Sequence, residues 1–179
     1  MKSAWCFLCL CVASFSFFSC AVPQPSPTKW VYQEKAITLY ADCENDLNLY
    51  DNSSHTLFVC IYQLSSPNGF NQLSSDVGGL YKLLESGLFD DSVVSVDNKT
   101  LYPGDHVEFQ FDRAENARFV GIVSGYANMS KQRISRLFKI PEVVDKIGFI
   151  RKKIEKKPGK LKVNMTFGPY SIEKSNEGS

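Results

Sequence analysis

Hydrophobic and polar residues alternate along several segments of the chain, which is typical of β-strands that bury one face. In residues 35–43, Ile37, Leu39 and Ala41 share one side, so this segment is predicted to form a strand. Residues 56–64 are almost wholly apolar and rich in β-branched and aromatic side chains. Such a run indicates a strand that is buried on both faces.

The period then changes to that of an amphipathic helix over residues 70–84. Asn68 is the expected cap at its start, and Gly87 is the expected end. Gly78 and Gly79 each weaken the middle by about 1 kcal/mol relative to alanine, so a break is expected there. The apolar stripe consists of Phe70, Leu73, Val77, Leu80, Tyr81 and Leu84.

Alternation returns in the second half of the chain. Gly121 and Gly125 lie in one of these segments and allow a bulky group to approach the strand closely. The pattern predicts four more strands, in residues 92–102, 106–112, 117–127 and 160–173.

The fold class that follows is mainly β. Residues 131–150 have an ambiguous pattern, in which Ile134, Leu137 and Phe138 are expected to form a short helical patch before Pro141. Strands joined by short turns, with one helix inserted early, indicate an antiparallel β-sandwich. The prediction is therefore a sandwich with an inserted amphipathic helix and a short additional helical patch.

The first 20 residues have the composition of a targeting segment. Lys2 supplies a positive charge, and residues 5–18 form an uncharged apolar run, shorter than the roughly 20 residues that span a bilayer. We interpret residues 1–19 as a signal peptide. Ser19 before Cys20 resembles a bacterial lipobox, in which the cysteine is lipidated and the chain is cut just before it. The alternative is ordinary secretion, with cleavage near Ser19 or Ala21 and no lipid.

The segment after Cys20 is rich in proline, which fixes the backbone and removes hydrogen-bond donors. Residues 20–34 are therefore expected to form an extended tether. The domain is expected to span residues 35–173 and to end in a disordered tail at residues 174–179. Ala21 stands where an inner-membrane retention signal typically has Asp. This favours the outer membrane, with the domain on the periplasmic face.

Charge and motifs argue against several classes of function. The chain has 179 residues and a formal net charge of +1, so no overall basic field attracts nucleic acid. His55 and His106 are its two histidines, and neither has the neighbours of a zinc site. No phosphate-binding loop, dinucleotide fingerprint or nucleophile elbow is present. We expect no enzymatic activity, metal, cofactor or small-molecule substrate.

Several motifs resemble those of the TssJ lipoprotein family. The segment "DCENDLNLYDNSSHTLFVCIYQLSSPNGFNQL" resembles an Asn-bearing loop that leads into an apolar strand ending in Tyr-Gln-Leu and then a helix. "LYPGDHVEFQFD", "ARFVGIVSGYANMSKQR" and "KLKVNMTFG" resemble later strands of the family, so the likeness covers residues 35–172. The matching residues of the first segment are Asn48, Ile61, Tyr62, Gln63, Leu64 and Phe70.

This resemblance implies a non-enzymatic outer-membrane lipoprotein of the type VI secretion system, with a transthyretin-like β-sandwich fold. It also implies binding to the periplasmic domain of the inner-membrane protein TssM through the loop over residues 44–55. The apolar loop residues form either a docking patch or a cluster that packs back on the domain. The expected partner-binding residues are Asp46, Leu47, Asn48, Leu49, Tyr50 and Asp51.

Cys43 and Cys60 are the two cysteines beyond residue 20. In an oxidising compartment they are candidates for a disulfide, provided that their strands lie in facing sheets. Two buried free thiols are the alternative.

Two other questions stay open from the sequence. The basic run over residues 151–162 is either a contact for acidic lipid headgroups or an acidic partner, or a solvated turn around Pro158 and Gly159. The competing class of function is a periplasmic carrier that holds a small apolar ligand in a void between its sheets.

Overall fold

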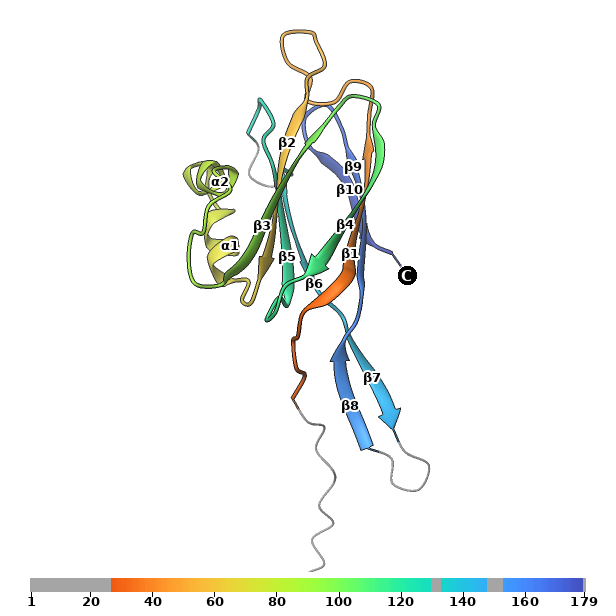
Figure 1. Cartoon of the computed structure of the whole chain (residues 1–179). Coiled ribbons are helices and arrows are strands. Elements are labelled where there is room, and N and C mark those ends of the chain that lie inside the picture. Colours follow the sequence, from red (N-terminus) through yellow and green to blue (C-terminus); the bar gives the residue numbers. More distant parts are fainter. Residues whose placement is uncertain (1–26, 130–132, 148–152, 179) are drawn as a thin grey trace, which may run out of the picture.

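The protein is a sandwich of two four-stranded sheets with a separate two-stranded hairpin (Figure 1). The computed structural model describes residues 27–129, 133–147 and 153–178. Cys20, the predicted signal peptide and most of the predicted tether lie outside the described residues. None of the described helices is long and apolar enough to cross a membrane.

The first sheet has the strand order β10-β9-β1-β4. Its first strand along the chain, β1, is a central strand, because it is hydrogen-bonded on both sides, antiparallel to β4 and parallel to β9. The parallel pair adds one exception to the predicted antiparallel pattern. Ile37, Leu39 and Ala41 are buried on one face, as their alternation predicted. The strands are β1 (Gln33–Cys43), β4 (His106–Arg113), β9 (Leu161–Phe167) and β10 (Ile172–Glu177).

The second sheet has the order β3-β2-β5-β6, and β2 is buried on both faces. Gln63 reaches across to the first sheet, where its amide donates to the carbonyl of Asp112 at 2.8 Å. Tyr62 points the other way, and its hydroxyl donates to the carbonyl of Leu83 in a helix. The strands are β2 (Leu57–Leu64), β3 (Val93–Leu101), β5 (Phe119–Ser124) and β6 (Ser135–Lys139).

Two short helices, α1 (Asn68–Leu73) and α2 (Val77–Leu84), cover the outer face of the second sheet (Figure 1). The predicted break at Gly78 and Gly79 is wrong in position. The break falls before Asp76, whose Oδ1 accepts from the backbone N–H of Gly79 at 2.9 Å and so starts a new helix. The predicted cap at Asn68 is also wrong, because Pro67 holds that place without a side-chain bond.

Three other predictions are wrong because contacts with distant parts of the chain decide the structure. The expected helical patch is β6, which pairs with the free edge of β5. Phe138 of β6 and the flanking Ile134 and Ile140 are buried, at spacings of four and two residues that fit a strand. The expected tail is ordered as far as Glu177, because β10 pairs with β9. The tether is also shorter than predicted, since Trp30 is buried and β1 begins at Gln33.

Cys43 and Cys60 are both buried free thiols. Their strands do lie in different sheets, but Cys60 points toward the helices, where its sulfur lies 2.9 Å from Oγ of Ser86. Cys43 is on the opposite side of β2, in the first sheet. The candidate disulfide is therefore not formed. Burial, with a smaller effect of Asp105, raises the pKa of the Cys43 thiol to about 12, so it stays protonated at neutral pH.

Candidate functional site

Four connections gather at one end of the sandwich, which we call the loop end. They are the β1–β2 loop, the β3–β4 turn, the β5–β6 loop and the β9–β10 turn. The opposite end carries the β7–β8 hairpin and the start of the described chain (Figure 1). The strand β1 runs from one end to the other and leads directly into the β1–β2 loop, which contains the predicted partner-binding residues.

Two of the six predicted partner-binding residues are buried beneath the loop. Leu47 is fully buried, and Asn48 is almost so. The Asn48 Oδ1 accepts from the backbone N–H of Ala127 at 2.9 Å, and its Nδ2 donates to the carbonyl of Thr56 at 2.9 Å. The φ of 47° at Asn48 is in the left-handed region that asparagine tolerates better than most residues. These two residues therefore hold the loop in shape.

The other four predicted residues face outward. Asp46, Tyr50 and Asp51 are exposed, and Leu49 is half-buried. Tyr50 and Ser53 exchange two backbone hydrogen bonds of 3.0 Å, and both residues between them have positive φ. This is a tight hairpin turn. It presents Tyr50, whose ring lies against the ring of His55 with the centroids 4.3 Å apart.

Two further exposed tyrosines belong to the loop end, and the sequence analysis missed them. Tyr50, Tyr102 and Tyr170 are 53%, 57% and 51% exposed. The turn of Tyr102 is attached to the β1–β2 loop by the bond from Gly104 N–H to the carbonyl of Glu44, at 3.3 Å. The turn of Tyr170 is attached by the bond from Leu49 N–H to the carbonyl of Pro169, at 2.8 Å. Exposed tyrosines are typical anchors of protein interfaces.

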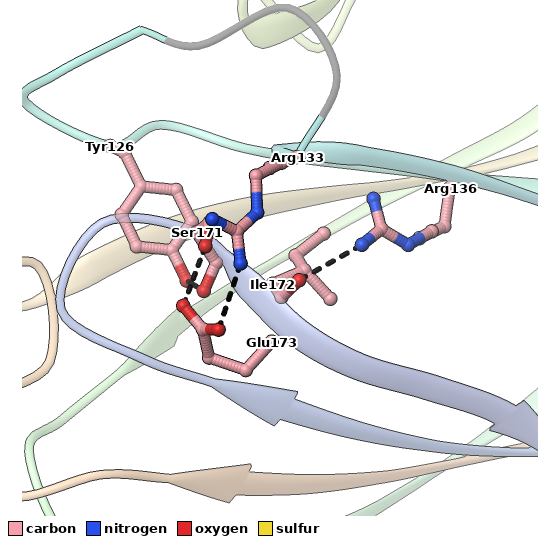
Figure 2. A network of polar contacts seen from close by, with 6 residues as sticks. All are labelled: Tyr126, Arg133, Arg136, Ser171, Ile172 and Glu173. Atoms are coloured by element: carbon pink, nitrogen blue, oxygen red, sulfur yellow. Dashed lines mark hydrogen bonds and ion pairs between the residues drawn. The ribbon is translucent and has the colours of Figure 1, made fainter.

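A polar network fixes the loop end by joining β6 to β10 (Figure 2). The Tyr126 hydroxyl donates to the carbonyl of Ser171 at 2.7 Å. Arg133 forms a salt bridge of 3.0 Å with Glu173, which also accepts from the Ser171 hydroxyl at 2.6 Å. Nη2 of Arg136 donates to the carbonyl of Ile172 at 2.9 Å. These bonds cross between the two sheets, so the loops above them rest on a rigid base.

Burial raises the pKa of the Tyr126 phenol, with a smaller effect of Cys43. Its hydroxyl therefore remains a hydrogen-bond donor at neutral pH. Burial also lowers the pKa of the Arg136 guanidinium, but an arginine starts so high that it stays charged. Both groups keep the protonation state that the network in Figure 2 requires.

The site has the chemistry of a binding surface. Within the described ranges, no three His, Cys, Asp or Glu side chains are placed to hold a metal ion. The space between the sheets is occupied by buried side chains from both of them, including Ile37, Leu39, Val59 and Ile61. The cleft at the β3–β4 edge, lined by Gln63 and Lys99 among others, is open to solvent. These features suit contact with another macromolecule better than storage of a small apolar ligand.

Comparison with known proteins places this fold in a family. Residues 35–165 match the family model T6SS-SciN, described as "Type VI secretion lipoprotein, VasD, EvfM, TssJ, VC_A0113". A comparison with curated proteins finds no significant match.

Solved structures with the same fold include lipoproteins of this system. The T6SS lipoprotein TssJ1 from Pseudomonas aeruginosa is 16% identical with a TM-score of 0.60, and the match covers 83% of this chain and 97% of that one. Serratia marcescens Lip, a membrane-bound component of the type VI secretion system, is 18% identical with a TM-score of 0.60, over 80% and 96% of the two chains.

A third match is to a chain of a structure described as "T6SS protein TssM C-terminal domain (869-1107) from EAEC". It is 14% identical with a TM-score of 0.55, over 80% of this chain and 97% of that one. The structural likenesses establish the β-sandwich fold, and the family model matches well over half of the sequence. This chain belongs to the TssJ family of type VI secretion lipoproteins.

Proposed function

We propose that the protein is anchored in the outer membrane through a lipidated Cys20 and holds the periplasmic domain of a TssM-like inner-membrane protein at its loop end. It acts as a non-enzymatic scaffold of the secretion membrane complex. The observation that carries this proposal is the placement of a preformed, tyrosine-bearing loop surface at the end of the sandwich opposite to the start of the described chain (Figure 1).

The length of β1 suits this arrangement. Its 11 residues separate the two ends of the sandwich by about 35 Å at the rise of an extended strand. A lipid attached near the start of the chain therefore leaves the loop end directed away from the membrane surface. One of the structures that this chain resembles is described as "Type VI membrane complex". That description supports a role for this protein in a membrane complex.

The exposed part of the β1–β2 loop is the expected contact for the partner. We expect Leu49→Ala with Tyr50→Ala to weaken binding of a TssM-like periplasmic domain by more than about 30-fold, because buried tyrosines at interface centres contribute about 2 kcal/mol or more. Isothermal titration calorimetry with the purified domains measures the change.

A matched control is available on the helical side. Tyr81 and Leu88 are 58% and 76% exposed and belong to α2 and the segment after it, outside the four connections of the loop end, so Tyr81→Ala with Leu88→Ala is expected to leave the affinity unchanged. Wild-type protein that does not bind the TssM-like domain contradicts the proposal. Equal affinities of the wild type and the loop variant remove the β1–β2 loop from the interface.

The anchor is tested separately. We expect radioactive palmitate to label the wild-type protein and to leave the Cys20→Ala variant unlabelled and released from the membrane fraction. Acyl chains contribute about 0.8 kcal/mol per buried CH₂, so their loss abolishes stable attachment. Equal labelling of the two proteins, or a mature wild-type chain without fatty acids, shows that Cys20 is not the anchor.

A further inference from the structure

The β7–β8 hairpin stands apart from both sheets of the sandwich. β7 (Glu142–Ile147) and β8 (Lys153–Pro158) pair with each other and form a sheet of their own. The hairpin extends from the end of the sandwich where the described chain begins, opposite to the loop end (Figure 1). It therefore lies on the side of the proposed anchor.

Polar contacts fix the base of the hairpin beside the N-terminal segment. Arg113 is almost completely buried, and its guanidinium donates to the carbonyl of Val31 at 2.8 Å and to the carbonyl of Gly159 at 3.3 Å. Thr28 donates through its hydroxyl to Glu142 at 2.5 Å. Thr28 and Val31 are therefore held at the base of the hairpin.

The net charge of the hairpin and the residues that follow it is positive. Residues 142–147 and 153–162 together contain six lysines and three acidic residues, a net charge of +3 in a chain whose total is +1. Lys156, Lys157 and Lys160 are exposed, as is Lys29 of the N-terminal segment. Exposed apolar side chains stand among these lysines, namely Val31, Tyr32, Val143 and Val144. Lysines interspersed with exposed apolar and tyrosine side chains are typical of surfaces that rest on lipid headgroups.

We propose that the strands β7 and β8 and residues 27–32 rest on the anionic phospholipid headgroups of the membrane that holds the anchor. This inference builds on the proposed function, because only six residues lie between Cys20 and Pro27. The seven steps from the Cα atom of Cys20 to that of Pro27 reach at most about 25 Å, so a lipidated Cys20 keeps this end close to the membrane surface. The complementary charge identifies anionic lipid as the ligand.

The contact would orient the domain, and the acyl chains would supply most of the attachment. Each lysine near an anionic surface strengthens binding about fivefold, and the effect falls off within roughly 10 Å at moderate salt. With the domain already tethered, such contacts are formed at a high effective concentration. They hold the loop end away from the membrane, where a partner can reach it.

The test uses protein without the lipid, so that headgroup attraction is measured alone. A chain beginning at residue 20 with Cys20→Ser keeps the whole described core, which lies between Trp30 and Ile172. We expect it to bind vesicles of phosphatidylethanolamine and phosphatidylglycerol in sedimentation assays, and to bind phosphatidylcholine vesicles at least tenfold more weakly. Adding Lys156→Gln and Lys157→Gln is expected to weaken binding to the anionic vesicles about 25-fold.

Lys82→Gln with Lys174→Gln is the matched control, because both lysines are exposed and lie on α2 and β10. It removes the same charge and is expected to change vesicle binding less than twofold. Equal binding to anionic and neutral vesicles overturns the proposal, and so does an equal loss in the two variants. Circular dichroism confirms that each variant is folded.

The same variants separate this proposal from the proposed function. Lys156→Gln with Lys157→Gln is expected to leave the affinity for the TssM-like domain unchanged, since the hairpin is at the opposite end. A loss of that affinity identifies the hairpin as a protein contact and overturns the membrane assignment. If palmitate does not label Cys20, the proposed lipid anchor is wrong. The vesicle assay still tests the headgroup contact, because it uses protein without the lipid.

Discussion

Phe70→Ala is expected to lower the free energy of unfolding by about 3–5 kcal/mol. Phe70 is the buried residue of α1, and its ring contacts the second sheet, with a centroid 6.2 Å from that of Tyr62. A helix of six residues has little stability of its own, so it depends on this anchor. Urea unfolding followed by circular dichroism measures the loss.

The complementary change is Gly121→Ala. A Cβ at Gly121 would lie 2.6 Å from a ring carbon of Phe70, so the ring occupies the space that the glycine leaves. In the wild-type background, we expect Gly121→Ala to lower the free energy of unfolding by about 1–3 kcal/mol. In the Phe70→Ala background the clash is absent, and the same change is expected to be neutral or slightly stabilising. Strictly additive effects contradict this packing.

Asn48→Ala is expected to lower the free energy of unfolding by about 2–4 kcal/mol. The change leaves the N–H of Ala127 and the carbonyl of Thr56 without their partner at a nearly buried position. It also places alanine at a φ of 47°. We expect weaker binding of the TssM-like domain as well, although Asn48 faces inward, because the loop loses its preformed shape. Chemical unfolding and calorimetry give the two values.

Two controls separate the causes of this loss. Asn48→Gly removes the same hydrogen bonds, but glycine accepts positive φ. Its free energy of unfolding is therefore expected to fall by about 1 kcal/mol less than that of Asn48→Ala. Asn52 is exposed and has a φ of 57°, so Asn52→Ala is expected to cost only about 1 kcal/mol. Wild-type stability of Asn48→Ala would show that the loop is not held by this side chain.

Local patterns in the sequence were sufficient to predict six of the eight strands in the two four-stranded sheets, all but β6 and β10. The alternation of Ile37, Leu39 and Ala41 and the doubly buried character of β2 are both confirmed. The close approach expected at Gly121 is confirmed by the ring of Phe70. The helical patch was wrong because Leu137 and Phe138 fit either period, and the free edge of β5 decides between them. Pairing between distant strands has no local signature.

The candidate site was predictable as a segment but not residue by residue. Leu47, Leu49 and Tyr50 are all largely apolar side chains in one loop, yet the structure buries the first and exposes the last. Tyr102 and Tyr170 were missed because each stands alone in a short turn. The strand order places the turns of Tyr50, Tyr102 and Tyr170 at the same end of the sandwich, which the sequence alone does not show. Their proximity is a property of the topology.

The central position of β1 in its sheet has a mechanical consequence. Cys20, β1 and Tyr50 follow one another in 31 residues of continuous chain. In the proposed arrangement, tension between the membrane and a partner bound at Tyr50 would therefore pass along one covalent backbone. The neighbouring strands β4 and β9 are hydrogen-bonded to β1 on both sides and support it. A steady pull can therefore cross the domain without stretching the weaker bonds that keep its two sheets together.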